Sequence, residues 1–464
     1  MTTAPNILVI ILDALREDGL GAALEQPDRC LRATTCVSTA PWTLPSCTSI
    51  LTGVSAAHHG HFWRNPPLGE NQLLAALPGE YRKIGFVNNG AISAGSGVDS
   101  GFDSWSLSLD HDKQFRRALR AIRRAGGRRP SFILLHSNIV HDYSLPVTAR
   151  YLPPGSPPVL GDRVISWRDT TQEDRDAAVA AYAACVTAQK AKVEAVLDAV
   201  RQRDDFLTVV TADHGEGFDY DLGRVHHGGR LHQDLLHVPL YFDLPSAVPA
   251  ARRDGLSDAL GSRVLSSTDI MPTILDLAGV RSLPDVDGVP AERIGDRTLV
   301  GEDRRYLYIK GPFRLNYRGH NKHMSEQDLE ENRRMLDQLA TGPLIRSFLR
   351  HPHKLIVTAL TLGTGVATGA ERDRLLEFGG RLLGSPVLAL HADRLFAFEE
   401  YDIAADPLEL HNRLGESADW ARELGQGDWS GSVSVPDPDG TELPLASLLD
   451  GAEFVQLSGG AQPL

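Results

Sequence analysis

Two carboxylates in the sequence each follow a run of apolar residues. Asp13 ends the segment 6–13, and Asp213 ends the segment 205–213. Unbroken apolar runs indicate strands covered on both faces, and open α/β sheets bind their ligands at the carboxyl ends of such strands. Asp13 is therefore a candidate metal ligand, with helix capping as the structural alternative. His214 follows Asp213 at once, and an adjacent carboxylate and imidazole at a strand end form a metal-ligand pair.

Thr43 is a candidate reactive hydroxyl. It lies in the stretch 40–53, where an apolar-aromatic pair precedes the hydroxyl and a proline and a small polar run follow it. This order predicts a loop that opens a helix, with Thr43 near the helix N-terminus. Unpaired N–H groups at a helix start would stabilise an anion beside the hydroxyl. An ordinary helix cap is the alternative interpretation.

Three further histidines are candidate proton donors or ligands. His136 ends the predicted strand 131–136, and His141 follows five residues later, so that both could face one pocket. His227 lies in a glycine-rich loop after Asp213 and adds a nitrogen donor. A structural role is the alternative for each of them.

Composition limits the partners that this chain can have. Its 464 residues carry a formal net charge of -13, which repels a polyanion such as duplex nucleic acid. The N-terminus has no basic segment, and its apolar run stops at Asp13, so neither a signal peptide nor a membrane span is expected. Four cysteines without C-x-x-C spacing suit reduced thiols in a cytoplasmic protein: Cys30, Cys36, Cys47 and Cys185.

Taken together, these segments resemble the sulfatase-like branch of the alkaline phosphatase superfamily. The resemblance covers most of the chain in the family's order, and this collinearity is far more specific than any single motif. The segments that carry it are 6–18, 42–53 with 58–60, 101–103, 213–216, 227–228 with 238–240, 269–273 and 400–412.

The resemblance implies a role for each candidate residue. Thr43 would be the nucleophile, and the metal ligands would be Asp13, Asp213, His214 and Thr43 Oγ. A bound divalent cation lowers the pKa of water from roughly 16 to about 7, and it should acidify the threonine hydroxyl in the same sense. Attack on a phosphoryl group would leave a covalent phospho-threonine. His227, with His141 or His136 as alternatives, would stabilise the leaving oxygen or act as general acid.

Departures from the family pattern indicate the substrate and the metal. Sulfatases of this branch carry a cysteine or serine that is matured to formylglycine and is followed by x-Pro-x-Arg. Thr43 occupies the first place here and Cys47 the last, so no formylglycine is expected. Ala14 follows Asp13 where sulfatases tend to have paired acids, which favours manganese or zinc over calcium. Whether a second metal binds stays open. His141 and His227 could serve as its histidine ligands, but residues 137–142 do not match the acidic spacing of two-metal relatives.

The sequence therefore predicts a metal-dependent phosphoesterase or phosphotransferase. Its substrate would be a small-molecule phosphodiester, phosphomonoester or phosphonate ester. The alternatives are a sulfate (sulfuryl) ester hydrolase without formylglycine and a catalytically silent relative that binds an anionic ligand or partner. The sequence does not fix the oligomeric state.

The predicted fold is α/β, with a mainly parallel sheet flanked by helices in residues 1–300. A smaller α+β subdomain would follow in residues 301–464, with a helical insertion around 321–349. The pattern predicts strands at 6–13, 81–88, 131–136 and 205–213 and helices at 112–124, 171–203 and 271–279.

Overall fold

The computed structural model divides the chain into two units. The first comprises residues 1–164, 170–218 and 234–296, and the second comprises 165–169, 219–233 and 297–464. The segment that carries His227 thus belongs to the second unit, although the expected boundary was residue 300. The residues that the structure describes are 4–20, 24, 29–62, 70–126, 129–156, 171–219, 224–280, 284–304, 344–361, 376, 387–391, 394–416, 420, 422, 424, 429, 433–436, 442–450 and 452–456.

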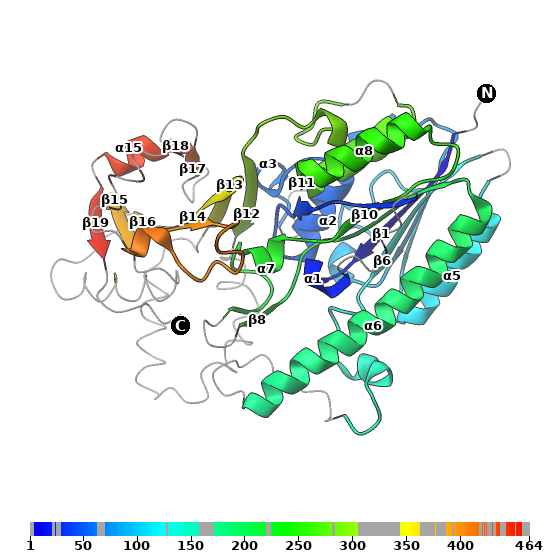
Figure 1. The fold of residues 1–464 in the computed structure, drawn as a ribbon, viewed down its shortest axis with the longest axis horizontal. Helices are drawn as coiled ribbons and strands as arrows, with labels where there is room; N and C mark the ends of the chain where they lie inside the picture. Colours follow the sequence, from blue (N-terminus) through cyan, green and yellow to red (C-terminus); the bar gives the residue numbers. More distant parts are fainter. Residues whose placement is uncertain are drawn as a thin grey trace. The chain divides into compact units, whose positions relative to one another are not determined.

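A seven-stranded sheet forms the centre of the first unit, in the order β2-β10-β7-β1-β6-β4-β5 (Figure 1). β10 is antiparallel to β2 and β7, and the strands from β7 to β5 are parallel. Every residue of β1, β6 and β7 is buried, which explains their continuous apolar sequences. The strands are β1 (Asn6–Leu12), β2 (Cys30–Arg32), β4 (Arg82–Val87), β5 (Ser104–Leu107), β6 (Ser131–Ser137), β7 (Phe206–Ala212) and β10 (Leu240–Asp243).

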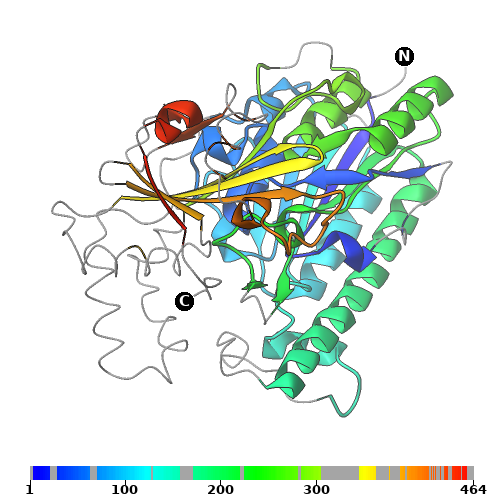
Figure 2. The ribbon, with the colours of Figure 1, turned by 60° about the vertical axis from the view of Figure 1, so that its left-hand side comes forward.

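Helices cover both faces of this sheet, with α5 and α6 on one side and α2 and α8 on the other (Figures 1 and 2). This arrangement confirms the predicted α/β class. Within the described ranges, every helix is too short or too polar to cross a bilayer. The helices are α1 (Glu17–Leu20), α2 (Thr43–Thr52), α3 (Ala56–His59), α4 (Gln72–Ala76), α5 (His111–Arg124), α6 (Gln172–Arg203), α7 (Gln233–Leu236), α8 (Ala250–Ser262) and α9 (Ile270–Leu277).

Short elements complete the first unit and lead into the second. β3 (Thr35–Val37) pairs in parallel with β11 (Val264–Ser266). The chain passes into the second unit through β8 (Gly217–Asp219) and β9 (Arg224–His226). The 3₁₀ turns of the first unit are η1 (Gly90–Ile92), η2 (Pro146–Tyr151), η4 (Ser267–Asp269) and η5 (Ala291–Arg293).

The second unit is built on an antiparallel sheet in the order β12-β13-β14-β16-β15-β19. Its core contains aromatic side chains from the sheet and the following loops, among them Phe396, Phe398, Trp420 and Trp429. The elements are β12 (Leu299–Arg304), β13 (Leu344–Arg350), β14 (His353–Thr361), β15 (Val387–His391), β16 (Arg394–Asp402), η7 (Arg413–Glu416), β17 (Ser434–Pro436), β18 (Glu442–Pro444), α15 (Leu445–Leu449) and β19 (Glu453–Gln456).

The prediction of a helical insertion at 321–349 is wrong for its last six residues, 344–349. Residues 344–349 belong to β13, which pairs with β12 on one side and β14 on the other. Pairing on both edges buries these residues, and such tertiary context overrides a local helical preference. The remainder of that prediction, 321–343, lies outside the described residues.

Candidate active site

The carboxyl ends of three adjacent strands bring Asp213, Asp13 and His136 together. β1 lies between β7 and β6, and Leu12 pairs with Ala212 in the parallel register. The two aspartates therefore leave their strands at the same level. All three side chains are fully buried.

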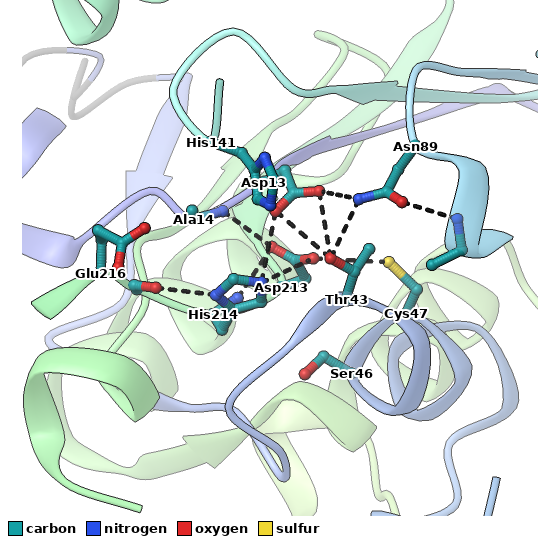
Figure 3. Close-up of polar contacts among 12 residues, drawn as sticks. Asp13, Ala14, Thr43, Ser46, Cys47, Asn89, His141, Asp213, His214 and Glu216 are labelled. Atoms are coloured by element: carbon teal, nitrogen blue, oxygen red, sulfur yellow. Dashed lines mark hydrogen bonds and ion pairs between the residues drawn. The ribbon is translucent and has the colours of Figure 1, made fainter. Parts of the chain in front are cut away.

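The backbone turn after β1 orients the Asp213 carboxylate. Ala14 has a φ of 58°, a left-handed conformation that costs a residue with a Cβ roughly 1–2 kcal/mol. In this conformation its N–H donates to Asp213 Oδ1 across 3.3 Å, and the N–H of His214 donates to the same oxygen across 2.9 Å. The two donors hold Oδ1, so that Oδ2 is the oxygen that faces the neighbouring imidazoles (Figure 3).

Gly215 is required by the close approach of two backbone segments. Its N–H donates to Leu235 O at 2.7 Å, and a Cβ at this position would lie 2.0 Å from Asp234 O. Its φ does not lie in the left-handed region. The structural reason for this glycine is therefore space.

Thr43 is the first residue of α2, as the sequence predicts. Its Oγ1 lies 3.3 Å from Asp13 Oδ2 and 3.5 Å from Asp13 Oδ1, and its side chain is almost completely buried. The loop before α2 is fixed to the strand end, because Ser38 Oγ donates to the backbone oxygen of Asp213 across 2.6 Å. Hydrogen bonds thus connect the loop that leads to Thr43 with the strand end that carries Asp213, and Thr43 itself contacts Asp13.

Asn89 completes the surroundings of the Thr43 hydroxyl. It follows β4, and its Nδ2 donates to Asp13 Oδ2 across 2.7 Å and to Thr43 Oγ1 across 3.2 Å (Figure 3). Its Oδ1 accepts from the N–H of Ala91 at 2.8 Å, which fixes the orientation of the amide. Sequence reasoning missed this residue. The only available signal was a polar side chain directly after the predicted strand 81–88.

Two imidazoles face the paired carboxylates. His214 Nε2 lies 3.4 Å from Asp13 Oδ1 and 3.6 Å from Asp213 Oδ2. His136 Nε2 lies 3.5 Å from Asp13 Oδ2 and 3.9 Å from Asp213 Oδ2. The Nδ1 of His214 interacts with Gly215 O at 2.8 Å, which directs its Nε2 toward the carboxylates.

His141 is held by a chain of polar groups that ends at a buried histidine. Its Nδ1 lies 2.9 Å from Asp142 Oδ1, and the other carboxylate oxygen of Asp142 lies 3.0 Å from His111 Nε2. His111 is fully buried at the start of α5. The His111–Asp142 pair therefore fixes the ring of His141 beside Asp13, where Figure 3 shows it. Neither His111 nor Asp142 was singled out from the sequence.

The charged groups of the site shift one another's pKa. Burial lowers the pKa of His141, but the negative charges of Asp13 and Asp142 raise it overall to about 10. Burial also lowers the pKa of His214, but the negative charges of Asp213 and Asp13 raise it overall to about 9. Burial raises the pKa of Asp13, yet the neighbouring imidazoles hold it well below its usual range. The Asp13 carboxylate is thus ionised at neutral pH.

The thiol of Cys47 is buried one helical turn after Thr43. Its Sγ lies 3.9 Å from Asp213 Oδ2, to which it donates a weak hydrogen bond. Burial and the nearby charges of Asp213 and Asp13 raise the pKa of this thiol well above its ordinary value. Cys47 is therefore neutral in this arrangement.

The donor set fits a divalent cation. The ligand atoms of Asp13, Asp213 and His214 all lie within 4.8 Å of one another. Both carboxylates are fully buried, and their ion-pair partners in the described part of the chain are histidines, with no Arg or Lys among them. Buried carboxylates so close together are stable only with compensating positive charge. Mixed oxygen and nitrogen donors of this kind suit manganese or zinc.

The structure thus brings together most of the side chains that the sequence singled out. Asp13, Thr43, Asp213, His214 and His141 meet in the first unit. His227 lies in the second unit, directly after β9, and its role stays a prediction.

Comparison with known proteins identifies the family. A family model for the sulfatases matches residues 5–280, which is more than half of the chain. The chain belongs to the sulfatase family. This confirms the resemblance to the sulfatase-like branch of the alkaline phosphatase superfamily. A search of curated proteins gives no match.

Solved structures show the same fold across nearly the whole chain. The phosphonate monoester hydrolase of Agrobacterium radiobacter is 16% identical, with a TM-score of 0.57 and coverage of 98% of this chain and 100% of that one. A 2-O GAG sulfatase is 15% identical, with a TM-score of 0.57 and coverage of 99% of both chains. At such low identity the likeness shows the sulfatase fold and leaves the reaction open.

Proposed function

We propose that this sulfatase-family chain is a metal-dependent phosphoesterase or phosphotransferase that works through a covalent phospho-threonine at Thr43. The observation that carries the proposal is the position of the Thr43 hydroxyl, 3.3 Å from Asp13 and 3.2 Å from Asn89 at the start of a buried helix. Threonine does not match the maturation motif for formylglycine. The proposed substrate is a phosphodiester, phosphomonoester or phosphonate ester, and a fold neighbour described as a phosphonate monoester hydrolase supports the last of these.

Asp13, Asp213, His214 and Thr43 Oγ would hold one divalent ion, manganese or zinc. When bound, such an ion offsets charge on a phosphoryl oxygen and lowers the pKa of a neighbouring hydroxyl. The protein supplies the fixed geometry, since the two carboxylates and the hydroxyl come from elements that are tied to one another through hydrogen bonds.

The side chains around Thr43 suit an in-line displacement. Asp13 accepts the hydrogen of the Thr43 hydroxyl, and the Asn89 amide donates to the same oxygen as negative charge develops there. The bond from Thr43 Oγ to phosphorus forms while the bond from phosphorus to the leaving oxygen breaks. His141 lies beside Asp13, and its imidazolium can give a proton to the leaving oxygen. His227 is a second candidate for that proton transfer.

A second displacement then regenerates the enzyme. Water attacks phosphorus in a hydrolase, and an alcohol does so in a transferase. In both cases the Thr43 Oγ–phosphorus bond breaks, and the acceptor loses a proton. One covalent intermediate thus serves both reactions.

Trapping the intermediate tests the proposal. Wild-type protein, Thr43→Ser and Thr43→Ala would be mixed with matched aryl phosphate, phosphodiester, phosphonate and sulfate esters, quenched in acid and digested. We expect a phosphorylated peptide containing residue 43 in the wild type and in Thr43→Ser, and no turnover in Thr43→Ala. Thr39→Ser, whose hydroxyl contacts Ser49, is the matched control and should behave as wild type.

The other outcomes decide between the alternatives. Turnover of the sulfate ester alone would support the sulfate ester hydrolase without formylglycine. Binding of the esters without any turnover would support the silent relative. The cytoplasmic location stays a prediction, which the four free and buried cysteines support.

A further inference from the structure

A second group of ligand-type side chains lies against the same aspartate. It consists of Cys47, His136 and Asp213, whose Sγ, imidazole nitrogen and carboxylate oxygen all lie within 4.8 Å of one another. Both Cys47 Sγ and His136 Nε2 are 3.9 Å from Asp213 Oδ2. The proposed reaction uses neither Cys47 nor His136.

His136 is the side chain that points to a ligand. It is fully buried, and neither of its ring nitrogens has a hydrogen-bond partner in the described part of the chain. A buried polar group without such a partner costs about 1–3 kcal/mol, and such groups in native proteins usually have a specific reason. Its Nε2 is directed at the Asp13 and Asp213 carboxylates, at distances too long for a hydrogen bond.

The separations match the spacing of ligands around one metal ion. Zinc binds imidazole nitrogen and carboxylate oxygen at about 2.0–2.2 Å and thiolate sulfur at about 2.3 Å, so tetrahedral ligand atoms lie about 3.4–3.6 Å apart. The two 3.9 Å distances to Asp213 Oδ2 need only a few tenths of an ångström of contraction. Asp13 Oδ2, 3.5 Å from His136 Nε2, is already at the spacing of a further ligand.

We propose that Cys47, His136 and Asp213 form a second cation site, which takes a thiolate-binding ion such as zinc. It shares Asp213 with the set that contains Asp13 and His214. In the view of Figure 3, Cys47 and His214 approach the Asp213 carboxylate from opposite sides. Binding releases the thiol proton to solvent, and the sulfur then coordinates as the thiolate. The proposed cation site does not depend on which substrate Thr43 attacks.

Cobalt reports both the number of ions and the presence of sulfur. The full-length protein would be stripped with a chelator and reloaded with Co²⁺, and bound cobalt would be counted by elemental analysis. We expect two ions per chain and a near-ultraviolet thiolate-to-cobalt charge-transfer band. Cys47→Ser should retain one ion and lose the band. Cys185→Ser, which changes a buried thiol on α6, should keep both.

Two further variants guard against a folding defect and a misassigned band. His136→Gln should also fall to one ion, while circular dichroism of both site variants shows a folded chain. His214→Ala should keep the charge-transfer band, since sulfur coordination does not need His214.

Several results would overturn the proposal. These are a wild-type protein without the charge-transfer band, a band that persists in Cys47→Ser, and a single cobalt ion per chain that carries the band. The last result would mean one enlarged site. Failure of the proposed function is distinguishable, because it would leave two bound ions and the band but no phosphorylated Thr43.

Discussion

The side-chain amide of Asn89 donates to the hydroxyl oxygen of Thr43 across 3.2 Å. The amide cannot turn over without losing the hydrogen bond that its Oδ1 accepts from the N–H of Ala91. Asn89 therefore presents a fixed donor to the oxygen that would attack phosphorus. Fixed donors of this kind stabilise developing charge without reorganisation during the reaction.

Replacing Asn89 should reduce turnover without unfolding the protein. We expect Asn89→Ala to lower kcat by about 100-fold, the size typical of losing one donor to a developing charge. Asn89→Asp should lower kcat further, because a carboxylate in place of the amide would face Asp13 Oδ2 at the position where Nδ2 now lies 2.7 Å away. Steady-state kinetics with the ester that wild type turns over measures both effects.

Asn71→Ala is the matched control for these kinetics. Asn71 caps α4, so its loss should lower stability and leave kcat near that of wild type. An Asn89→Ala enzyme with kcat within twofold of wild type would remove Asn89 from the mechanism.

The raised pKa of His141 predicts a pH dependence of stability in the metal-free protein. Its pKa is about 10 when folded and near 6.5 in an unfolded chain, because Asp13 and Asp142 stabilise the imidazolium. The folded state therefore binds this proton more tightly. The stability that results is fully present below pH about 6.5 and is lost as the pH rises toward about 10.

Urea unfolding at pH 6, 8 and 10 after chelation would measure this loss. The free energy of unfolding should fall across the series in wild type and should fall less in His141→Gln. His58→Gln, which changes an exposed histidine paired with Asp287, should retain the wild-type slope. Equal slopes for wild type and His141→Gln would show that His141 does not carry the effect.

The sequence predicted the elements that local patterns encode. The apolar runs before Asp13 and Asp213 are β1 and β7, and the long amphipathic segment 171–203 is α6. The start of α2 at Thr43 follows from its own residues. Each of these depends on periodicity or on turn residues that lie within the segment itself.

The remaining parts of the site depend on strand order, which no local pattern encodes. Asn89, His136 and Cys47 converge because β4 and β6 end, and α2 begins, near the carboxyl end of β1, and only the completed sheet brings them there. The misassigned residues 344–349 have the same cause, since β13 is defined by its two neighbouring strands. The sequence of residues 344–349 alone does not indicate that they pair with β12 and β14.

A buried ion pair in the second unit predicts a large effect on stability. Lys354 Nζ lies 2.7 Å from Glu409 Oε1, and both side chains are almost completely buried. Lys354→Met should destabilise the fold by about 3–5 kcal/mol, because it leaves the Glu409 charge buried without its partner. The double variant with Glu409→Gln should recover much of this loss, since the amide carries no charge.

Denaturant titration of the two single variants and the double variant gives the coupling energy. Glu409 also accepts a hydrogen bond from the N–H of Gln233, which a glutamine at 409 can retain through its amide oxygen. Additive losses in the double variant would show that the pair contributes no net interaction.

Metal binding at the proposed Asp13 site should stabilise the folded chain. An ion that binds only the folded state adds about 2.7 kcal/mol at a free concentration one hundred times its dissociation constant. Adding Mn²⁺, which prefers oxygen and nitrogen ligands to thiolate, to chelated protein should therefore raise Tm, and Asp13→Asn should abolish most of the rise because it removes one of the two buried carboxylates. Asp287→Asn, whose carboxylate pairs with His58, should respond as wild type does. Calorimetry of the three proteins with and without added ion makes the comparison, and an undiminished rise in Asp13→Asn would place the stabilising ion elsewhere.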